Sequence, residues 1–212
     1  MEYEDDYSNY GNEVLYQMCA NQPGHDDRNI VYSKLWIIGR AYSATIERGA
    51  PRGFNIMQTV DLIVENNLNI DQQIAGIANI LRPEMDDIPN ILIVLQAHKY
   101  FTDMLHATTG LYKRSLASKY LHFHSPQSVF IFDAFANANV RAHINENEDL
   151  RHLYQWLRAE VDNVLVDNAY ASFYCRCLVY RNFLEDGGLL LTPRGLDMML
   201  LGYANLHAAP EQ

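Results

Sequence analysis

The sequence predicts an all-α protein, built as a compact multi-helix bundle of about nine or ten short helices. Apolar residues recur at spacings of three and four through most of the 212 residues, which is the period of one helix face. Glycine, proline and capping residues interrupt this pattern at intervals typical of helices. No pair of strands is evident, because Phe130–Phe132 is too short to found a sheet and Gly187–Leu191 has no recognisable partner.

Four helices are expected in the N-terminal half. The first carries an apolar stripe from Val31 to Tyr42 and is ended by Gly49. Asp71 is the expected N-cap of the third, which Pro83 ends. In order, the helices cover about 29–48, a segment through Ile56, Val60 and Ile63, a segment from Asp71 with Ile74, Ile77 and Leu81 on one face, and 88–105.

Five more helices are expected in the C-terminal half, where capping residues set the boundaries. Asp133 opens one of them. The long helix at about 169–184 is stopped by Gly187–Gly188. Thr192 followed by Pro193 is a cap with proline at the first helical position. These helices cover about 115–124, 133–145, 149–161, 169–184 and 194–203. We therefore expect a single all-α domain over residues 1–212, with two helical lobes that meet near residues 110–145.

The chain is acidic, and its charge is unevenly spread. The formal net charge is −10 and the pI is about 5.1, which argues against a dedicated nucleic-acid binder. Residues 98–124, however, carry four basic side chains against one acid, together with four histidines. A local basic face on an acidic body is one interpretation of this segment, and solvated helix ends are the other.

The composition indicates a cytoplasmic protein that does not bind membranes. No run of about 18 apolar residues is present, and the acidic start lacks the basic-then-apolar pattern of a signal peptide. The three cysteines are typical of buried, reduced thiols, and the pair Cys175 and Cys177 alone is a poor metal clamp. We therefore expect neither a metal nor another cofactor.

The most informative segment runs from Gly110 to Arg141. It reads as a short connection, an amphipathic helix, a proline-bearing turn, an apolar run and then a helix opened by Asp133. Because Asp133 directly follows Phe130–Phe132, its carboxylate is expected at the edge of the core. A carboxylate in that setting caps the next helix or takes part in chemistry.

This segment resembles the helix-hairpin-helix and the following aspartate of the base-excision DNA glycosylases, the family that includes the 8-oxoguanine and adenine glycosylases. Ser115 and Ala117 match the family's helix that begins with lysine or serine, any residue, and alanine. Asp133 matches the family's aspartate, 18 positions after Ser115 (133 − 115). Val140 and Arg141 resemble the family's continuation after the acid.

The resemblance implies a DNA N-glycosylase of base-excision repair, which flips its target base into a pocket. Asp133 would stabilise the positive charge that develops on the sugar, or activate a water. Some members use a lysine nucleophile where this chain has Ser115, so the resemblance places the chain in the purely hydrolytic group. Lys113, Arg114 and Lys119 would contact the DNA phosphates.

The segment departs from the family at the hairpin. Leu111, Tyr112 and Lys113 stand where the family has two glycines, and such side chains hinder contact between backbone amides and a phosphate. The four cysteines of an iron–sulfur cluster are also missing. The alternative is a catalytically inactive glycosylase-fold module that binds a purine-type nucleobase or a protein partner, as in bacterial anti-phage defence systems. In that case Asp133 caps a helix or accepts hydrogen bonds from a base.

Several other side chains are candidates for contacting the base, each with a structural alternative. His122 and His124 are at the end of a predicted helix. The functional interpretation is that they line a pocket, and the structural alternatives are that they stabilise the helix dipole or bond to the loop before Asp133. Arg40 lies among apolar neighbours, as a base contact or in a buried ion pair. The candidates on the long C-terminal helix are Phe173, Tyr174 and Cys177. They are interpreted either as groups that contact or stack on the base or as core residues.

Overall fold

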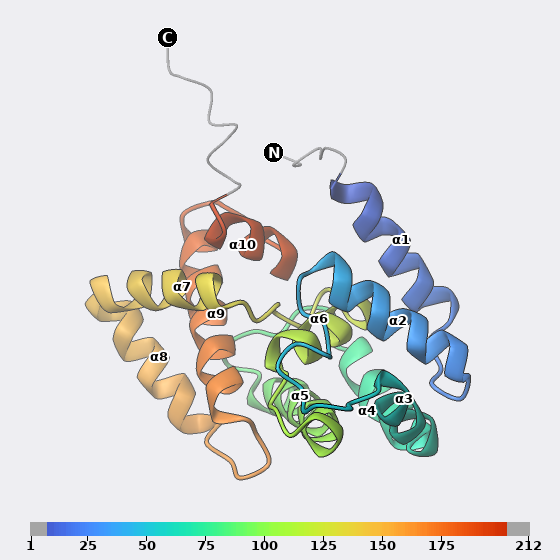
Figure 1. Cartoon of the computed structure of the whole chain (residues 1–212). Coiled ribbons are helices and arrows are strands. Elements are labelled where there is room, and N and C mark those ends of the chain that lie inside the picture. The colour runs from blue at the N-terminus through green and yellow to red at the C-terminus, as the bar shows by residue number, and fades with distance from the viewer. Residues whose placement is uncertain (1–7, 203–212) are drawn as a thin grey trace.

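A computed structural model describes residues 8–202 of the chain (Figure 1). This part contains ten α-helices and no strand, which confirms the predicted all-α class. None of the described helices is long and apolar enough to cross a lipid bilayer. The helices are α1 (Ser8–Asn21), α2 (Arg28–Ala41), α3 (Ile56–Glu65), α4 (Asn67–Ala78), α5 (Ile88–Thr109), α6 (Arg114–His124), α7 (Ala134–Glu146), α8 (Glu148–Glu160), α9 (Asn168–Asp186) and α10 (Pro193–Leu200).

The helices form two groups that share one apolar core. In Figure 1, α1 to α6 lie on one side of the molecule and α7 to α10 on the other, with α9 packed against α5 between them. Buried apolar side chains run continuously through both groups. The irregular stretch between α6 and α7 connects the two groups and ends at Asp133.

Side chains hold this connecting stretch in place, because its backbone pairs with no strand. The Tyr170 hydroxyl donates to the Phe130 carbonyl at 2.8 Å, and the Phe132 N–H donates to Ser118 Oγ at 2.8 Å. The Tyr174 hydroxyl donates to the Ser128 carbonyl at 3.0 Å. Helices α6 and α9 therefore fix the stretch from both sides, and this brings Asp133 to a defined position at the start of α7.

The predicted end of the first N-terminal helix is wrong. Helix α2 stops at Ala41 and not near residue 48, because the chain turns back across Gly39. The Ala44 N–H donates to the Gly39 carbonyl at 2.8 Å, and a Cβ on Gly39 would lie 3.2 Å from the Cα of Thr45. Ile46, beyond this turn, is buried as well, so the apolar spacing in the sequence continues past the end of the helix. This continued spacing concealed the break.

The prediction that Asp71 is an N-cap is also wrong. Asn66 precedes α4, and Asp71 lies inside that helix, where its carboxylate meets the His25 ring at 2.6 Å. Leu81 is 77% exposed, because α4 ends at Ala78 and the helical period ends with it.

The two ends of the described chain also differ from the prediction. Helix α1 was not predicted, because its apolar stripe is narrow. Leu15 and Cys19 are its buried apolar side chains. The last helix, expected over 194–203, is α10 and ends at Leu200. Residue 203 lies outside the described residues.

Candidate functional site

A cleft of about 340 Å³ lies where α6, the start of α7 and α10 approach one another. This volume is in the range of small-molecule sites. The cleft combines four charged side chains with an aromatic ring and three apolar ones. Its lining residues are Tyr42, Lys119, Ile131, Asp133, Arg194, Asp197, Met198 and Leu201.

Asp133 lies at the rim of this cleft as the N-cap of α7. Its Oδ1 accepts a hydrogen bond from the Phe135 N–H at 2.8 Å, so the predicted capping role is confirmed. The residue is half-buried. The carboxylate therefore stabilises the helix and faces the cleft at the same time.

Lys119 lies in the wall of the cleft and not on the protein surface. It is only 4% exposed, and its ammonium donates to Ser115 Oγ at 3.0 Å and to the Tyr42 carbonyl at 3.2 Å. Burial lowers the pKa of Lys119, while the charge of Asp133 opposes that shift. Ser115 is one helical turn before Lys119 and does not line the cleft. Its connection to the cleft is the hydrogen bond from Lys119.

Helix α10 contributes two charged residues, Arg194 and Asp197. Thr192 caps this helix, and its Oγ1 accepts from the Gly195 N–H at 3.0 Å. Arg194 donates to Asp197 Oδ2, and its guanidinium lies 5.5 Å from the centre of the Tyr42 ring. Burial raises the pKa of Asp197 to about 6, although the charge of Arg194 lowers it.

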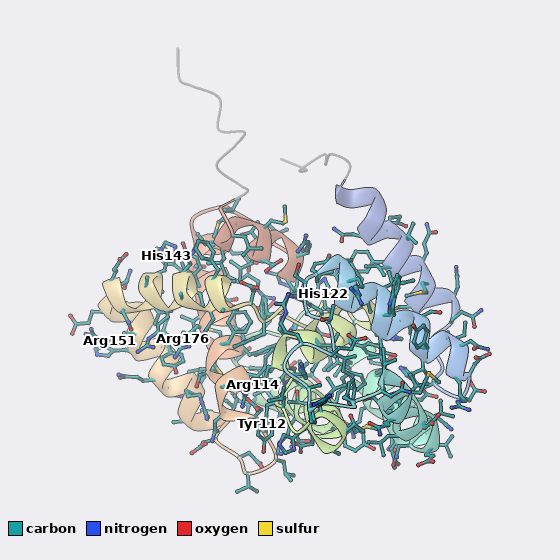
Figure 2. All side chains as sticks on the ribbon, viewed as in Figure 1. Tyr112, Arg114, His122, His143, Arg151 and Arg176 are labelled. Carbon is teal, nitrogen blue, oxygen red and sulfur yellow. The ribbon has the colours of Figure 1, made fainter. Side chains whose placement is uncertain are left out.

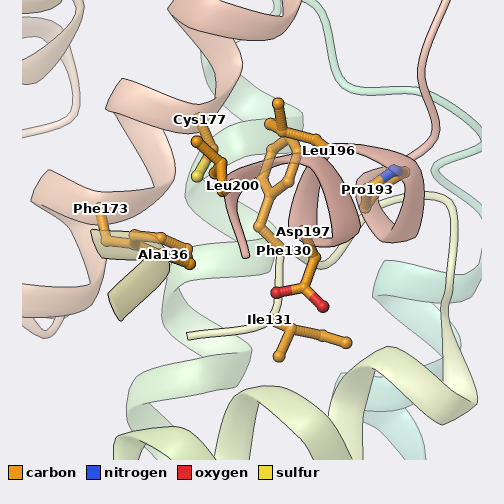
Figure 3. A pocket seen from close by; sticks show the side chains of 9 residues that line it. All are labelled: Phe130, Ile131, Ala136, Phe173, Cys177, Pro193, Leu196, Asp197 and Leu200. Carbon is orange, nitrogen blue, oxygen red and sulfur yellow. The ribbon is translucent and has the colours of Figure 1, made fainter. Parts of the chain in front are cut away.

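An apolar contact region without measurable free volume lies behind Asp197 (Figure 3). Phe173 and Cys177 of α9 belong to this region and are buried, so neither reaches the open cleft. Tyr174 is also buried and packs edge-on against Phe130, with ring centroids 5.1 Å apart. These three side chains are core residues, and a role in stacking on a base stays a prediction.

The structure does not gather the predicted phosphate contacts into one face. Arg114 is engaged by Asp167 at 2.8 Å and lies over the ring of Tyr112, 5.2 Å from its centre (Figure 2). The Lys113 ammonium donates to the Arg48 carbonyl. Lys119 is buried in the wall of the cleft, where its ammonium donates to Ser115 and to the Tyr42 carbonyl. Contact between these residues and phosphates stays a prediction.

The remaining candidates lie outside the cleft lining. The buried His122 ring donates from Nδ1 to the Val129 carbonyl at 2.8 Å, which confirms the predicted bond to the loop before Asp133. Its other nitrogen then accepts from the Tyr16 hydroxyl at 2.8 Å. Burial lowers the pKa of His122 to about 4, so the ring is neutral near pH 7.

His124 and Arg40 have different surroundings. The ring of His124 lies 5.2 Å from that of His25, and its buried Nε2 has no hydrogen-bond partner. Arg40 is exposed and lies over the ring of Trp36, 5.8 Å from its centre. The buried ion pair suggested for Arg40 is therefore wrong, because the side chain is on the surface. Among residues 8–202, no cluster of three or more metal-binding side chains is present.

Sequence reasoning missed both charged residues of α10. Asp197 interrupts the apolar run from Leu196 to Leu200, which is the same signal that singled out Asp133. Arg194 lies three residues before Asp197, on the same helix face. An acid within an apolar run thus marks both carboxylates of the cleft.

A scan against protein-family models and searches of curated proteins and of solved structures found no match to this chain. The chemistry of the cleft therefore has to follow from its own residues.

Proposed function

We propose that the cleft binds a purine-type base and that the protein hydrolyses the N-glycosidic bond of that base in DNA. The observation that carries this proposal is the carboxylate of Asp133 at the rim of a 340 Å³ cleft. The buried ammonium of Lys119 in the same cleft adds support, because buried charges are costly and gather at functional sites.

The reaction breaks the bond between the sugar carbon and the base nitrogen, and the electron pair of this bond leaves with the base. Positive charge then develops on the sugar, and Asp133 is the group that stabilises it. Water supplies the hydroxyl that the sugar carbon gains and the proton that the base gains. Lys119 and Arg194 balance the two carboxylates of the cleft, so the cleft suits an uncharged base.

The test is incubation with duplexes that carry 8-oxoguanine, uracil or adenine opposite a mismatch, followed by alkali. We expect strand scission by the wild type on one of these duplexes, and a loss of at least about 100-fold for Asp133→Asn. Asp27→Asn is the matched control, since Asp27 caps α2 as Asp133 caps α7 but does not line the cleft. Asparagine is a good cap, so neither variant should lose its fold.

Scission of none of the duplexes, or equal activity of the wild type and Asp133→Asn, would contradict the proposal. Trapping with sodium borohydride gives a second readout, because it captures a Schiff base between a lysine amine and the sugar. Purely hydrolytic chemistry predicts no trapped complex. A complex that disappears in Lys119→Met would show that the Lys119 amine is the nucleophile.

The second candidate is a binding module without catalysis, which recognises a nucleobase or a protein partner. The hairpin favours it, because Leu111 and Tyr112 are 37% and 53% exposed where close contact with DNA would need glycine. The net charge of −10 favours it as well. Thermal shift by nucleosides, with no shift by duplex DNA, would support this candidate over the enzyme.

A further inference from the structure

Asp197 has an unsatisfied oxygen in the wall of the cleft. The residue is 4% exposed, Arg194 donates to its Oδ2, and its buried Oδ1 has no hydrogen-bond partner. Figure 3 shows the carboxylate directed toward Ile131, a residue that lines the cleft and the closed apolar region behind it. Buried polar atoms without partners are rare in folded proteins, and each one calls for an explanation.

The other groups near Asp197 do not satisfy this oxygen. Lys119 donates to Ser115 and to the Tyr42 carbonyl, and Arg194 donates to the opposite oxygen of Asp197. The charged and titratable groups that face Asp197 come from every neighbouring element, and they are Tyr16, Tyr42, Lys119, Asp133, Cys177 and Arg194.

The surroundings define the kind of ligand that would complete the site. The free oxygen is an acceptor, so the ligand must bring a donor. Tyr42, Ile131 and Met198 offer flat or apolar contacts, and the two cations already balance the two carboxylates, which favours an uncharged planar ring. The terminal torsion of an aspartate is broad, so its rotation can present either oxygen to the cleft while Arg194 holds the other.

We propose that Asp197 is a specificity-determining residue, whose carboxylate accepts hydrogen bonds from an uncharged ring that carries an N–H beside an amino group. This pair of donors is the edge of a guanine-type base. This inference rests on the proposed function, because it assumes that the same cleft binds the base. It does not require that the protein hydrolyses the glycosidic bond. A ring that presents an acceptor at this edge, as adenine does, would leave Asp197 unpaired and bind weakly.

The test is calorimetric titration of the full chain with guanosine, inosine and adenosine. We expect guanosine to bind most tightly, inosine more weakly because it lacks the amino group, and adenosine most weakly. Asp197→Asn should weaken guanosine binding by about 10- to 100-fold, since one acceptor is replaced by a donor. Asp197→Glu keeps the charge one methylene further out, and Asp27→Asn is the control away from the cleft.

The pH profile separates recognition from a merely structural role. Because the pKa of Asp197 is about 6, guanosine affinity should fall about tenfold between pH 8 and pH 5. This fall should be absent in Asp197→Asn and present in Asp197→Glu. The proposal is overturned if guanosine does not bind the wild type, if adenosine binds as tightly, or if Asp197→Asn binds guanosine like the wild type.

Failure of this inference can be told apart from failure of the proposed hydrolysis. Guanosine binding that depends on Asp197, without scission of any duplex, would support the recognition role and remove the enzymatic one. Scission that depends on Asp133 but is equal in wild type and Asp197→Asn would do the reverse.

Discussion

Two arginine–aspartate pairs, one joining α6 to the start of α9 and one within α10, show how differently an ion pair can be used. Arg114 Nε donates to both oxygens of Asp167, at 2.8 and 2.9 Å, and the Tyr170 N–H donates to the same carboxylate at 2.9 Å. Arg194 contacts one oxygen of Asp197, and the other oxygen has no partner. Both aspartates are largely buried.

The pKa values of the two carboxyl groups move in opposite directions for this reason. Burial opposes ionisation of Asp167, but the hydrogen bonds from Arg114 and the Tyr170 N–H outweigh it and lower the pKa. Burial dominates at Asp197 and raises the pKa to about 6. The first pair is complete without a ligand, and the second faces a cleft and is incomplete. An ion pair alone therefore does not mark a site, whereas free space beside an unsatisfied oxygen does.

The largest expected effect is a stabilisation of Asp197→Asn at neutral pH. The folded-state pKa of about 6 lies above the ordinary value of 3.8, so the folded state binds the proton more tightly and loses relative stability as the pH rises from about 4 to 6. At about 1.4 kcal/mol per pKa unit, Asp197→Asn should be about 3 kcal/mol more stable than the wild type at pH 7. Urea unfolding at pH 4 and pH 7 measures this.

At pH 4 the wild type and Asp197→Asn should have similar free energies of unfolding, because the carboxyl group is then largely neutral. A variant that is less stable than the wild type at pH 7 would show that Asp197 is a satisfied structural residue, and the contrast with Asp167 would be lost.

The next effect has the opposite sign. Asp167→Asn keeps an amide that can cap α9, but it loses the charge that Arg114 and the Tyr170 N–H stabilise. We expect a loss of about 2 kcal/mol at pH 7, since Arg114 is partly exposed and the pair is partly screened. This loss should shrink as the pH falls through the lowered pKa of Asp167. The free energy of unfolding from urea titrations over that range would reveal it, and a pH-independent difference would contradict it.

The smallest effect concerns the arginines. Arg114→Lys should cost about 1 kcal/mol, because an ammonium that contacts Asp167 has no planar group to lie over the Tyr112 ring. Arg194→Lys should cost less than about 0.5 kcal/mol, because a single contact to Asp197 is within the reach of an ammonium. The urea midpoints of the two variants give the comparison, and equal shifts would show that the two pairs are equally complete.

Local features of the candidate site could be predicted from the sequence. The position of Asp133 after an apolar run indicated a helix cap at the edge of the core, and the hydrogen bond from Phe135 confirms it. The bond from His122 to the loop before Asp133 was predicted from the same segment. Both features depend on residues within about a dozen positions of one another, where spacing limits the geometry.

The sequence by itself determined that this protein is all-helical, and its breaks and caps located most of the helices, because a period of 3.6 and a capping residue are local properties. Only the tertiary structure decided which charges share a cleft. Tyr42, Lys119 and Asp197 are far apart along the chain, and they meet because α10 packs near the start of α7 while the chain after α2 turns back across Gly39. Hydrophobic spacing says which face of a helix is buried, but it carries no information about which other helix covers that face or where the packing leaves a gap.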